Sequence, residues 1–252
     1  PIPRTLALII YGDLDVSVID ELPPGRQKVD TFAVGESYRR RVYAFLRKQV
    51  AAGYQVFVVC PLVHSGEEVP DERKAVTAYA KHLQEEVFPD LRVAVLHGKM
   101  KPKEKDAVMS AFAAGESDIL VSTTVIEVGV DVPNANTMVV ENAERFGLSQ
   151  LHQLRGRVGR GSAKSYCILL SDTQSEQTRQ RLKVLTQTND GFRISEEDLR
   201  LRGPGDFFGQ RQHGLPALQI ADLSCDMRVL TEAQQAAREL MARDPELSDP
   251  VH

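Results

Sequence analysis

The sequence has no long hydrophobic run and few cysteines. No apolar stretch approaches the roughly 18 to 20 residues that a membrane-spanning helix needs, and no signal-peptide pattern opens the chain. Cys60, Cys167 and Cys225 show no CxxC spacing, and two of them lie in apolar, strand-like runs. We therefore expect a soluble cytoplasmic protein with no membrane partner and no metal site, whose thiols are reduced, buried and inert.

The sequence also lacks the GxxxxGK[ST] loop that holds nucleotide phosphates in P-loop enzymes. Residues 16–21 and 71–74 imitate the acidic Walker B pattern, but neither segment follows such a loop, and we assign both to structure. Without Walker A and Walker B motifs, this chain should not hydrolyse ATP alone.

The charge of the chain is unevenly distributed. The formal net charge is -4, yet residues 145–214 carry 12 Lys and Arg against 7 Asp and Glu, whereas the remainder carries 19 against 28. A local basic excess of this kind is typical of a surface that contacts nucleic acid.

Apolar runs alternate with amphipathic helical stretches through residues 29–170, and they predict an α/β fold. Such alternation indicates parallel strands joined by right-handed crossovers, with helices on both faces of the sheet. The predicted strands are 29–34, 55–60, 92–96, 118–122, 137–141 and 165–170, and the predicted helices are 36–52, 72–88, 102–113 and 150–161.

Function in such sheets gathers at the carboxyl ends of the strands. His97 and Gly98 follow one predicted strand, and Thr123 and Thr124 follow another. Hydroxyls beside the amides of a helix start suit a phosphate of a nucleic-acid backbone, although ordinary helix capping is the alternative. For His97 we favour an orienting or backbone-contact role, because no second metal ligand stands at a suitable spacing.

Residues 150–161 read Gln-Leu-His-Gln-Leu-Arg-Gly-Arg-Val-Gly-Arg-Gly, and we predict a short helix here with Ser149 as its N-cap. On a helical wheel, three apolar side chains share one face, and three polar ones, two of them arginines, share the opposite face. The apolar face is formed by Leu151, Leu154 and Val158, and the polar face by Gln153, Arg157 and Arg160.

Two guanidiniums one helical turn apart suit the oxygens of a phosphoryl group in transfer, which is the role of an arginine finger. The alternative is a solvated basic face. Gly156 and Gly159 argue against that alternative, because each costs a helix roughly 1 kcal/mol relative to Ala and helps only where something approaches the backbone closely.

This segment resembles motif VI of superfamily 2 helicases and translocases, and residues 122–133 resemble their motif V. Residues 13–26, 97–100, 141–149 and 202–206 are similar to the RecG family of bacterial fork-remodelling helicases. The resemblance covers essentially the whole chain. It implies a RecA-like second motor domain with a C-terminal helical hairpin extension.

The resemblance also assigns roles to single residues. It gives catalytic roles to Arg157, Arg160 and Gln153, and nucleotide contacts to Gly129, Asp131 and the same two arginines. It implies nucleic-acid contacts for Thr123, Thr124, His97, Gly98, Arg202 and Gln212. The implied cofactor is ATP with Mg²⁺, held mainly by a first motor domain.

We expect three parts. Residues 1–27 would be a remnant of the first motor domain and a linker, residues 28–171 the second motor domain, and residues 172–252 the translocation motif and a C-terminal helix. Because Pro1 falls inside the family's motif III, we expect a fragment that lacks the first motor domain and the wedge domain.

The extension is predicted to contain a helix over residues 173–188 and a second helix that starts at Ser195 with a capping box and ends at Arg202. A loop over 203–216 then carries Gln212, and a packing helix spans 226–243. In the family, this loop reports nucleotide state to duplex DNA. The alternative is a plain surface loop.

The leading hypothesis is therefore the motor half of a monomeric, nucleoid-associated bacterial helicase. Its partners would be double-stranded and branched DNA, including replication forks and Holliday junctions. The alternatives are the motor of a transcription-repair coupling factor and a non-enzymatic DNA-binding module.

Overall fold

The computed structural model describes residues 27–61, 72–123, 132–202, 227–246 and 248. The chain divides into two compact units. One spans Glu21–Asp190, and the other includes Gly191–His252. Of the predicted site residues, Thr124, Gly129, Asp131 and Gln212 lie outside the described residues, as does Cys225.

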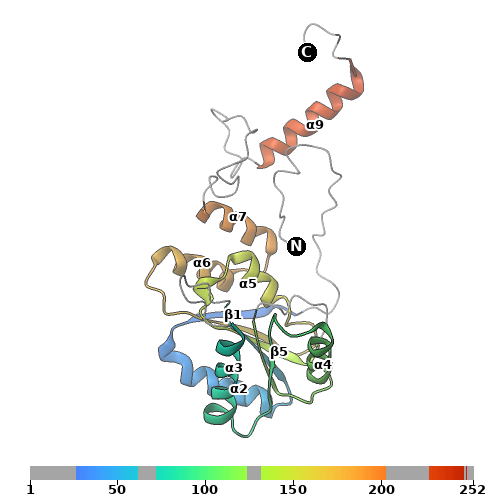
Figure 1. Cartoon of the computed structure of the whole chain (residues 1–252). Helices are drawn as coiled ribbons and strands as arrows, with labels where there is room; N and C mark the ends of the chain where they lie inside the picture. The colour runs from blue at the N-terminus through green and yellow to red at the C-terminus, as the bar shows by residue number, and fades with distance from the viewer. Residues whose placement is uncertain (1–26, 62–71, 124–131, 203–226, 247, 249–252) are drawn as a thin grey trace. The chain divides into compact units, whose positions relative to one another are not determined.

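The first unit is built on a six-stranded sheet in the order β1-β6-β5-β2-β4-β3, and every neighbouring pair is parallel (Figure 1). This confirms the predicted parallel α/β fold. The strands are β1 (Val29–Val34), β2 (Gln55–Val59), β3 (Val93–Leu96), β4 (Ile119–Ser122), β5 (Ala135–Val140) and β6 (Ser165–Leu170).

Helices connect these strands, and two more follow in the second unit. In the first unit they are α2 (Arg39–Ala51), α3 (Glu72–His82), α4 (Pro102–Ala113), α5 (Leu148–Arg155) and α6 (Glu176–Gln187), with short turns η1 (Glu36–Tyr38), η2 (Leu83–Val87) and η4 (Ala143–Arg145). The second unit contains α7 (Gly191–Arg202) and α9 (Met227–Arg243).

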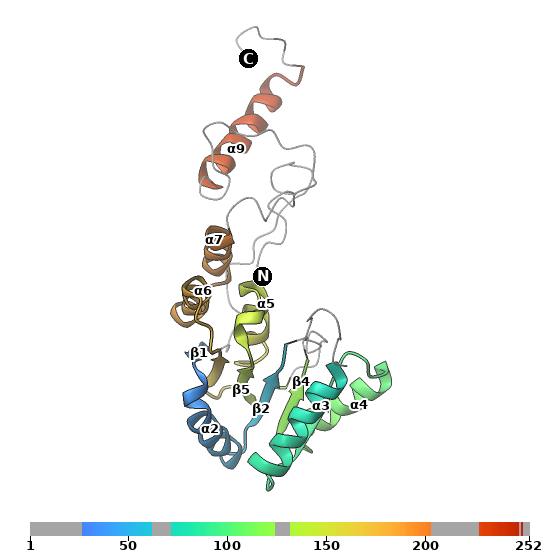
Figure 2. The same cartoon turned by 60° about the vertical axis from the view of Figure 1, so that its left-hand side comes forward.

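Apolar side chains of the sheet pack against helices on both of its faces. On one face, Val42 and Leu46 of α2 and Val76 of α3 join a buried cluster with strand residues. On the other face, Phe57 of β2 meets Phe112 of α4 with 5.0 Å between ring centroids. In both views α6 lies next to β1 (Figures 1 and 2). The strands are therefore apolar on both sides, as a covered parallel sheet requires.

Several helix boundaries differ from the sequence prediction. The helix predicted over 36–52 begins as the short turn η1, and the one predicted over 72–88 is an α-helix to His82 and then turns into the wider η2. The helix predicted from Ser195 begins at Gly191, so the polar run at 195–198 lies inside α7 and does not cap it. The C-terminal helix is confirmed as α9.

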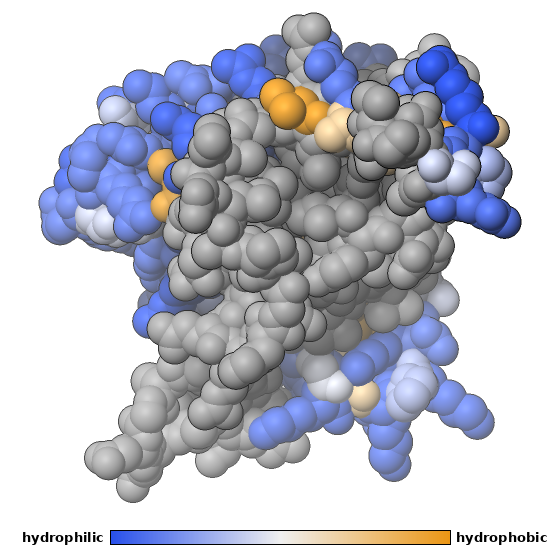
Figure 3. Space-filling view, turned by 90° about the horizontal axis from the view of Figure 1, so that it is seen from above, coloured by the Kyte–Doolittle hydropathy of each residue, from blue (hydrophilic) through white to orange (hydrophobic). Residues whose placement is uncertain are grey.

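The face shown in Figure 3 is mainly polar where its residues are described. Most coloured residues in Figure 3 are hydrophilic, and the hydrophobic ones lie singly or in small groups. Among the described residues, no helix is long and apolar enough to span a bilayer.

Burial should make two thiols unreactive. Burial, and at Cys60 also the charge of Glu141, raises the pKa of Cys60 to about 12, and burial raises the pKa of Cys167 to about 12. At about pH 8, roughly one thiol in 10⁴ would then be a thiolate, against about one in four at an ordinary pKa of about 8.5.

In a Cys225→Ser variant, we therefore expect iodoacetamide at about pH 8 to leave both remaining thiols unmodified in the native protein. Both should react once urea unfolds the chain, and mass spectrometry would count the adducts. Rapid alkylation of either thiol, while circular dichroism still shows a folded protein, would contradict this expectation.

Candidate nucleotide and DNA contact site

The carboxyl ends of β3 and β4 bring two predicted site residues side by side. His97 follows β3 and Thr123 follows β4, and these strands are neighbours in the sheet. The Thr123 amide donates a hydrogen bond to the Leu96 carbonyl at 3.2 Å. The sheet therefore brings His97 and Thr123 together at one edge, although more than twenty residues separate them in the sequence.

Both side chains carry a buried polar atom that has no hydrogen-bond partner among the described residues. His97 is 9% exposed and its Nδ1 has none, and Thr123 is 2% exposed and its Oγ1 has none. A buried polar atom left unsatisfied is costly, so two at neighbouring strand ends need an explanation. A polar ligand, such as a phosphate oxygen, would satisfy them.

The turn after His97 opens towards solvent and is rich in lysine. Gly98 is exposed there, and the Met100 amide closes the turn on the His97 carbonyl at 3.1 Å. Lys101 and Lys103 are exposed at the start of α4. Cations at a helix N-terminus oppose the helix dipole and favour an anion there. The sequence prediction missed these lysines, although their density in residues 99–105 was visible.

A buried ion pair fixes the end of the neighbouring strand β5. Glu141 is 6% exposed, and its carboxylate accepts two hydrogen bonds from the Arg39 guanidinium of α2, at 2.8 and 2.9 Å. The Tyr79 hydroxyl of α3 donates to the same carboxylate. Burial, and then the charge of Glu141, raises the pKa of Tyr79. Glu141, the first residue of the connection that leads to α5, is therefore held in place by these hydrogen bonds.

Helix α5 spans Leu148–Arg155, which corrects both predicted ends of the helix at 150–161. Gly147, and not Ser149, is the N-cap: its backbone is extended, and its amide donates to the Gln150 side chain at 3.2 Å. The helix stops at Gly156, so Arg157 and Arg160 lie on the turn that follows it. The wheel that placed them on one helical face is wrong for these two residues.

The glycines explain why the helix ends. Gly159 has φ of +79°, and a Cβ there would lie 3.0 Å from Val29 Cγ2 and 3.1 Å from the Gln27 carbonyl oxygen. A Cβ on Gly161 would lie 2.6 Å from the Pro133 carbonyl oxygen. Close approach was the predicted reason for Gly159, but the approaching group is the chain itself. The turn is thus held against the start of β1.

The apolar face of the segment is confirmed, and the polar residues lie outside it. Leu151 and Val158 are at most 1% exposed and Leu154 is 5% exposed. Gln153 and Arg160 are exposed, and Arg157 is half-buried. The Arg160 Nε donates to the Gly156 carbonyl at 3.4 Å. The buried apolar side chains therefore anchor a turn on which Arg160 is exposed to solvent.

Arg155 is a further residue of this segment that the sequence prediction overlooked. It is 2% exposed, and its guanidinium donates to the carbonyls of Leu185 and Thr188, both at 2.8 Å, and contacts Thr31 Oγ1 at 3.4 Å. Its Nη2 lies 2.9 Å from His152 Nδ1. On the same wheel, Arg155 lies about 40° from Leu151, next to the apolar sector, and this was the available signal.

Burial lowers the pKa of Arg155, yet a guanidinium keeps its charge in proteins. Two of its acceptors are carbonyls at the C-terminal end of α6, where the helix dipole is negative. The charge is therefore compensated by helix-end carbonyls, and it ties α5 to α6 and β1 within the first unit.

We expect Arg155→Met to lower the free energy of unfolding by about 2–4 kcal/mol, because it leaves two buried carbonyls without their donor. Urea denaturation followed by circular dichroism would measure this. Arg40→Met, at an exposed position of α2, is the matched control and should change stability by less than about 0.5 kcal/mol. Equal stability of the two variants would show that the buried guanidinium does not stabilise the fold.

No group of three or more His, Cys, Asp and Glu side chains that could hold a metal ion occurs within the described ranges. The groups described at this edge include the lysines at the start of α4, the Thr123 hydroxyl and the His97 imidazole. Such groups recognise phosphates.

Comparison with known proteins agrees with this geometry. Residues 39–162 match the helicase conserved C-terminal domain, and residues 188–252 match the C-terminal part of domain 3 of the ATP-dependent DNA helicase RecG. The chain belongs to the RecG family.

RecG relatives match over nearly the whole chain. The RecG of Synechocystis sp. is 53% identical over 98% of this chain and 30% of its own length, and that of Bacillus subtilis is 48% identical over 100% and 37%. A solved structure of RecG bound to a three-way DNA junction is 50% identical, with a TM-score of 0.71 over 91% of this chain and 29% of that chain. This chain thus spans about a third of the length of these RecG proteins, and its sheet has the RecA-like fold of helicase C-terminal domains.

Proposed function

We propose that this chain is the second motor domain and translocation element of a RecG-type ATP-dependent DNA helicase. The observation that supports this most strongly is the turn after α5. A face that is at most 5% exposed anchors it, its glycines leave no room for side chains, and Arg160 projects from it. Such a turn presents cations at a fixed position to a ligand held by another domain.

ATP with Mg²⁺ is proposed to be bound mainly by a first motor domain in the same polypeptide. Arg157 and Arg160 would reach its phosphates across the cleft, with Gln153 nearby. Gly129 and Asp131 would contact the nucleotide near its ribose. The parts 1–27, 28–171 and 172–252 remain our proposed division of the chain. The described chain would then contribute charge stabilisation, and hydrolysis would open and close the cleft.

The second ligand is proposed to be the sugar-phosphate backbone of DNA. The orphaned atoms of His97 and Thr123, the exposed Gly98 and the lysines at the start of α4 would form one contact, to which Thr124 would add a hydroxyl. Arg202 at the end of α7 and Gln212 in the segment 203–216 would form the other. Contacts of this kind position a duplex without reading its sequence.

Motion of the two contacts relative to each other would move the protein along duplex DNA. Branched DNA is the proposed substrate, since a relative has been solved on a three-way junction. Replication forks and Holliday junctions are the proposed physiological forms. We propose that the protein acts as a monomer in the bacterial cytoplasm, at the nucleoid.

The arginine assignment can be tested in the full-length protein. Arg157→Ala and Arg160→Ala should each lower the DNA-stimulated ATPase kcat by about 10³-fold or more, because an arginine finger contributes about that much to phosphoryl transfer. ATP affinity should change far less. Arg41→Ala, at an exposed position of α2, is the control. Normal stimulated ATPase in either finger variant would remove that arginine from the proposed role.

The alternative function, a DNA-binding module without enzymatic activity, predicts a different result for this chain by itself. One motor domain carries only part of the DNA-binding surface of the whole helicase. We therefore expect millimolar or undetectable affinity for a 30-base-pair duplex at about 0.1 M salt. Fluorescence anisotropy over a salt series would measure it. Tight binding by the 252-residue chain would favour the module.

A further inference from the structure

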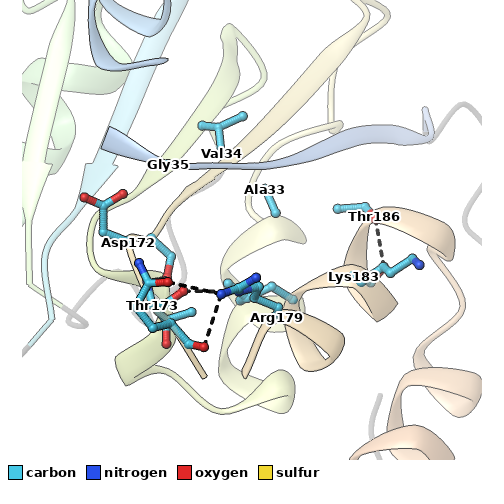
Figure 4. Close-up of a pocket in the computed structure, with 11 residues that line it drawn as sticks. Ala33, Val34, Gly35, Asp172, Thr173, Arg179, Lys183 and Thr186 are labelled. Carbon is cyan, nitrogen blue, oxygen red and sulfur yellow. Dashed lines mark hydrogen bonds between the residues drawn. The ribbon is translucent and has the colours of Figure 1, made fainter. Parts of the chain in front are cut away.

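A groove of about 540 Å³ lies beside β1, at the opposite edge of the sheet from His97 and Thr123. It is enclosed by the end of β1, the connection from β6 to α6, and one face of α6 (Figure 4). Ala33, Val34 and Leu182 give it an apolar part, and Arg179, Lys183 and Thr186 give it a polar side. The proposed helicase function uses none of these residues.

Strand β1 borders this cavity and is an edge strand of the described sheet. The Val34 carbonyl accepts a hydrogen bond from the Ser171 amide at 3.0 Å, so the backbone groups of Val34 face β6. Because backbone groups alternate in direction along a strand, the N–H and C=O of Ala33 point the other way. An outward row of this kind can pair with an added strand.

Helix α6 forms the opposite wall with residues spaced at i, i+3, i+4 and i+7. These are Arg179, Leu182, Lys183 and Thr186, which lie on one helical face. Leu182 is 3% exposed and forms the floor, whereas Arg179 and Lys183 are exposed at the rim. The groove therefore offers backbone hydrogen-bonding groups from β1, a small apolar surface at Leu182, and two cations, Arg179 and Lys183, at its rim.

The rim carries two exposed cations, of which Arg179 forms a long, solvent-exposed ion pair with Glu176. Arg179 donates to the Thr173 carbonyl at 3.4 Å and the Gln174 carbonyl at 3.2 Å, and Glu176 lies 4.0 Å away with its side chain 73% exposed. Figure 4 shows Arg179 turned towards this connection and Lys183 farther along the helix. An incoming acidic side chain would meet two cations about one helical turn apart.

We propose that this groove binds an extended, acidic peptide segment of a partner protein, added as a strand to the edge of β1. The peptide backbone would pair with the N–H and C=O of Ala33. Alternate side chains would point towards α6, with small apolar ones over Ala33 and Leu182 and acidic ones at Arg179 and Lys183. This is the β-augmentation mode, in which the main chain gives affinity and the helix wall gives specificity.

A nucleic-acid backbone fits the groove less well. Asp172 lines the cavity and is exposed, with its Oδ1 accepting a hydrogen bond from the Glu36 amide at 2.8 Å, so it would repel phosphates and acidic peptide side chains alike. The difference lies in the backbone, because a sugar-phosphate chain has no amide to pair with the Ala33 carbonyl. DNA binding is therefore the competing outcome in the test.

The test begins with a display library of random twelve-residue peptides, panned on the 252-residue chain. Selected peptides should be acidic and rich in β-branched residues. A fluorescein-labelled copy of one of them would then be titrated by anisotropy. Arg179→Glu with Lys183→Glu should weaken its binding by roughly twentyfold at about 0.1 M salt, since each exposed ion pair contributes up to about fivefold. Lys48→Glu, an exposed charge reversal on α2, should leave it unchanged.

A second variant tests strand pairing independently of charge. Ala33→Pro removes the outward N–H but no bond to β6, and proline is tolerated on edge strands. It should weaken the peptide at least fivefold, whereas Ala33→Ser, which keeps the N–H, should not. Circular dichroism would verify that both variants are folded.

Three results would overturn the proposal. The first is that panning does not enrich acidic peptides. The second is that the Arg179→Glu, Lys183→Glu variant binds the selected peptide as tightly as the unmodified chain. The third is that this variant loses affinity for duplex DNA but not for the peptide. None of them bears on the finger arginines, so the helicase proposal stands or falls separately through its ATPase measurement.

Discussion

The buried guanidinium of Arg155 connects the parts of the molecule on which the proposed motor depends. It reaches the Leu185 and Thr188 carbonyls at the end of α6 and the Thr31 hydroxyl on β1 from the last residue of α5. A buried cation is costly unless its donors are satisfied, so these acceptors fix where α5 ends. The turn with Arg157 and Arg160 starts directly after that fixed point.

Two glycines constrain the same turn from its other side, because a side chain at either position would clash with the backbone nearby. Gly159 adopts a positive φ and touches the backbone at Gln27, and Gly161 touches that of Pro133. Arginines on a long, flexible loop would lose much of their effect on a phosphoryl group, because ordering them costs entropy at the moment of reaction. Here packing and sterics have already fixed the backbone.

The polar groups at the strand ends are of two kinds: some bond to one another, and others have no partner among the described residues. Glu141, Arg39 and Tyr79 satisfy one another in a buried network at the end of β5. By contrast, His97 and Thr123 keep buried atoms without partners at the ends of β3 and β4. The first group stiffens the edge, and the second is what a DNA backbone would complete. The proposed peptide groove lies between β1 and α6, the two elements that Arg155 also joins to α5.

The sequence by itself determined the parallel sheet, most helix positions, the apolar face of Leu151, Leu154 and Val158, and the family, because periodicity and motif spacing are local properties of the chain. Only the tertiary structure decided where α5 ends, that Gly159 makes room for the chain itself, and that Arg155 is buried. It alone showed that His97 and Thr123 are neighbours and that β1 is an edge strand. These depend on contacts between residues far apart in sequence, which a helical wheel or a motif does not contain.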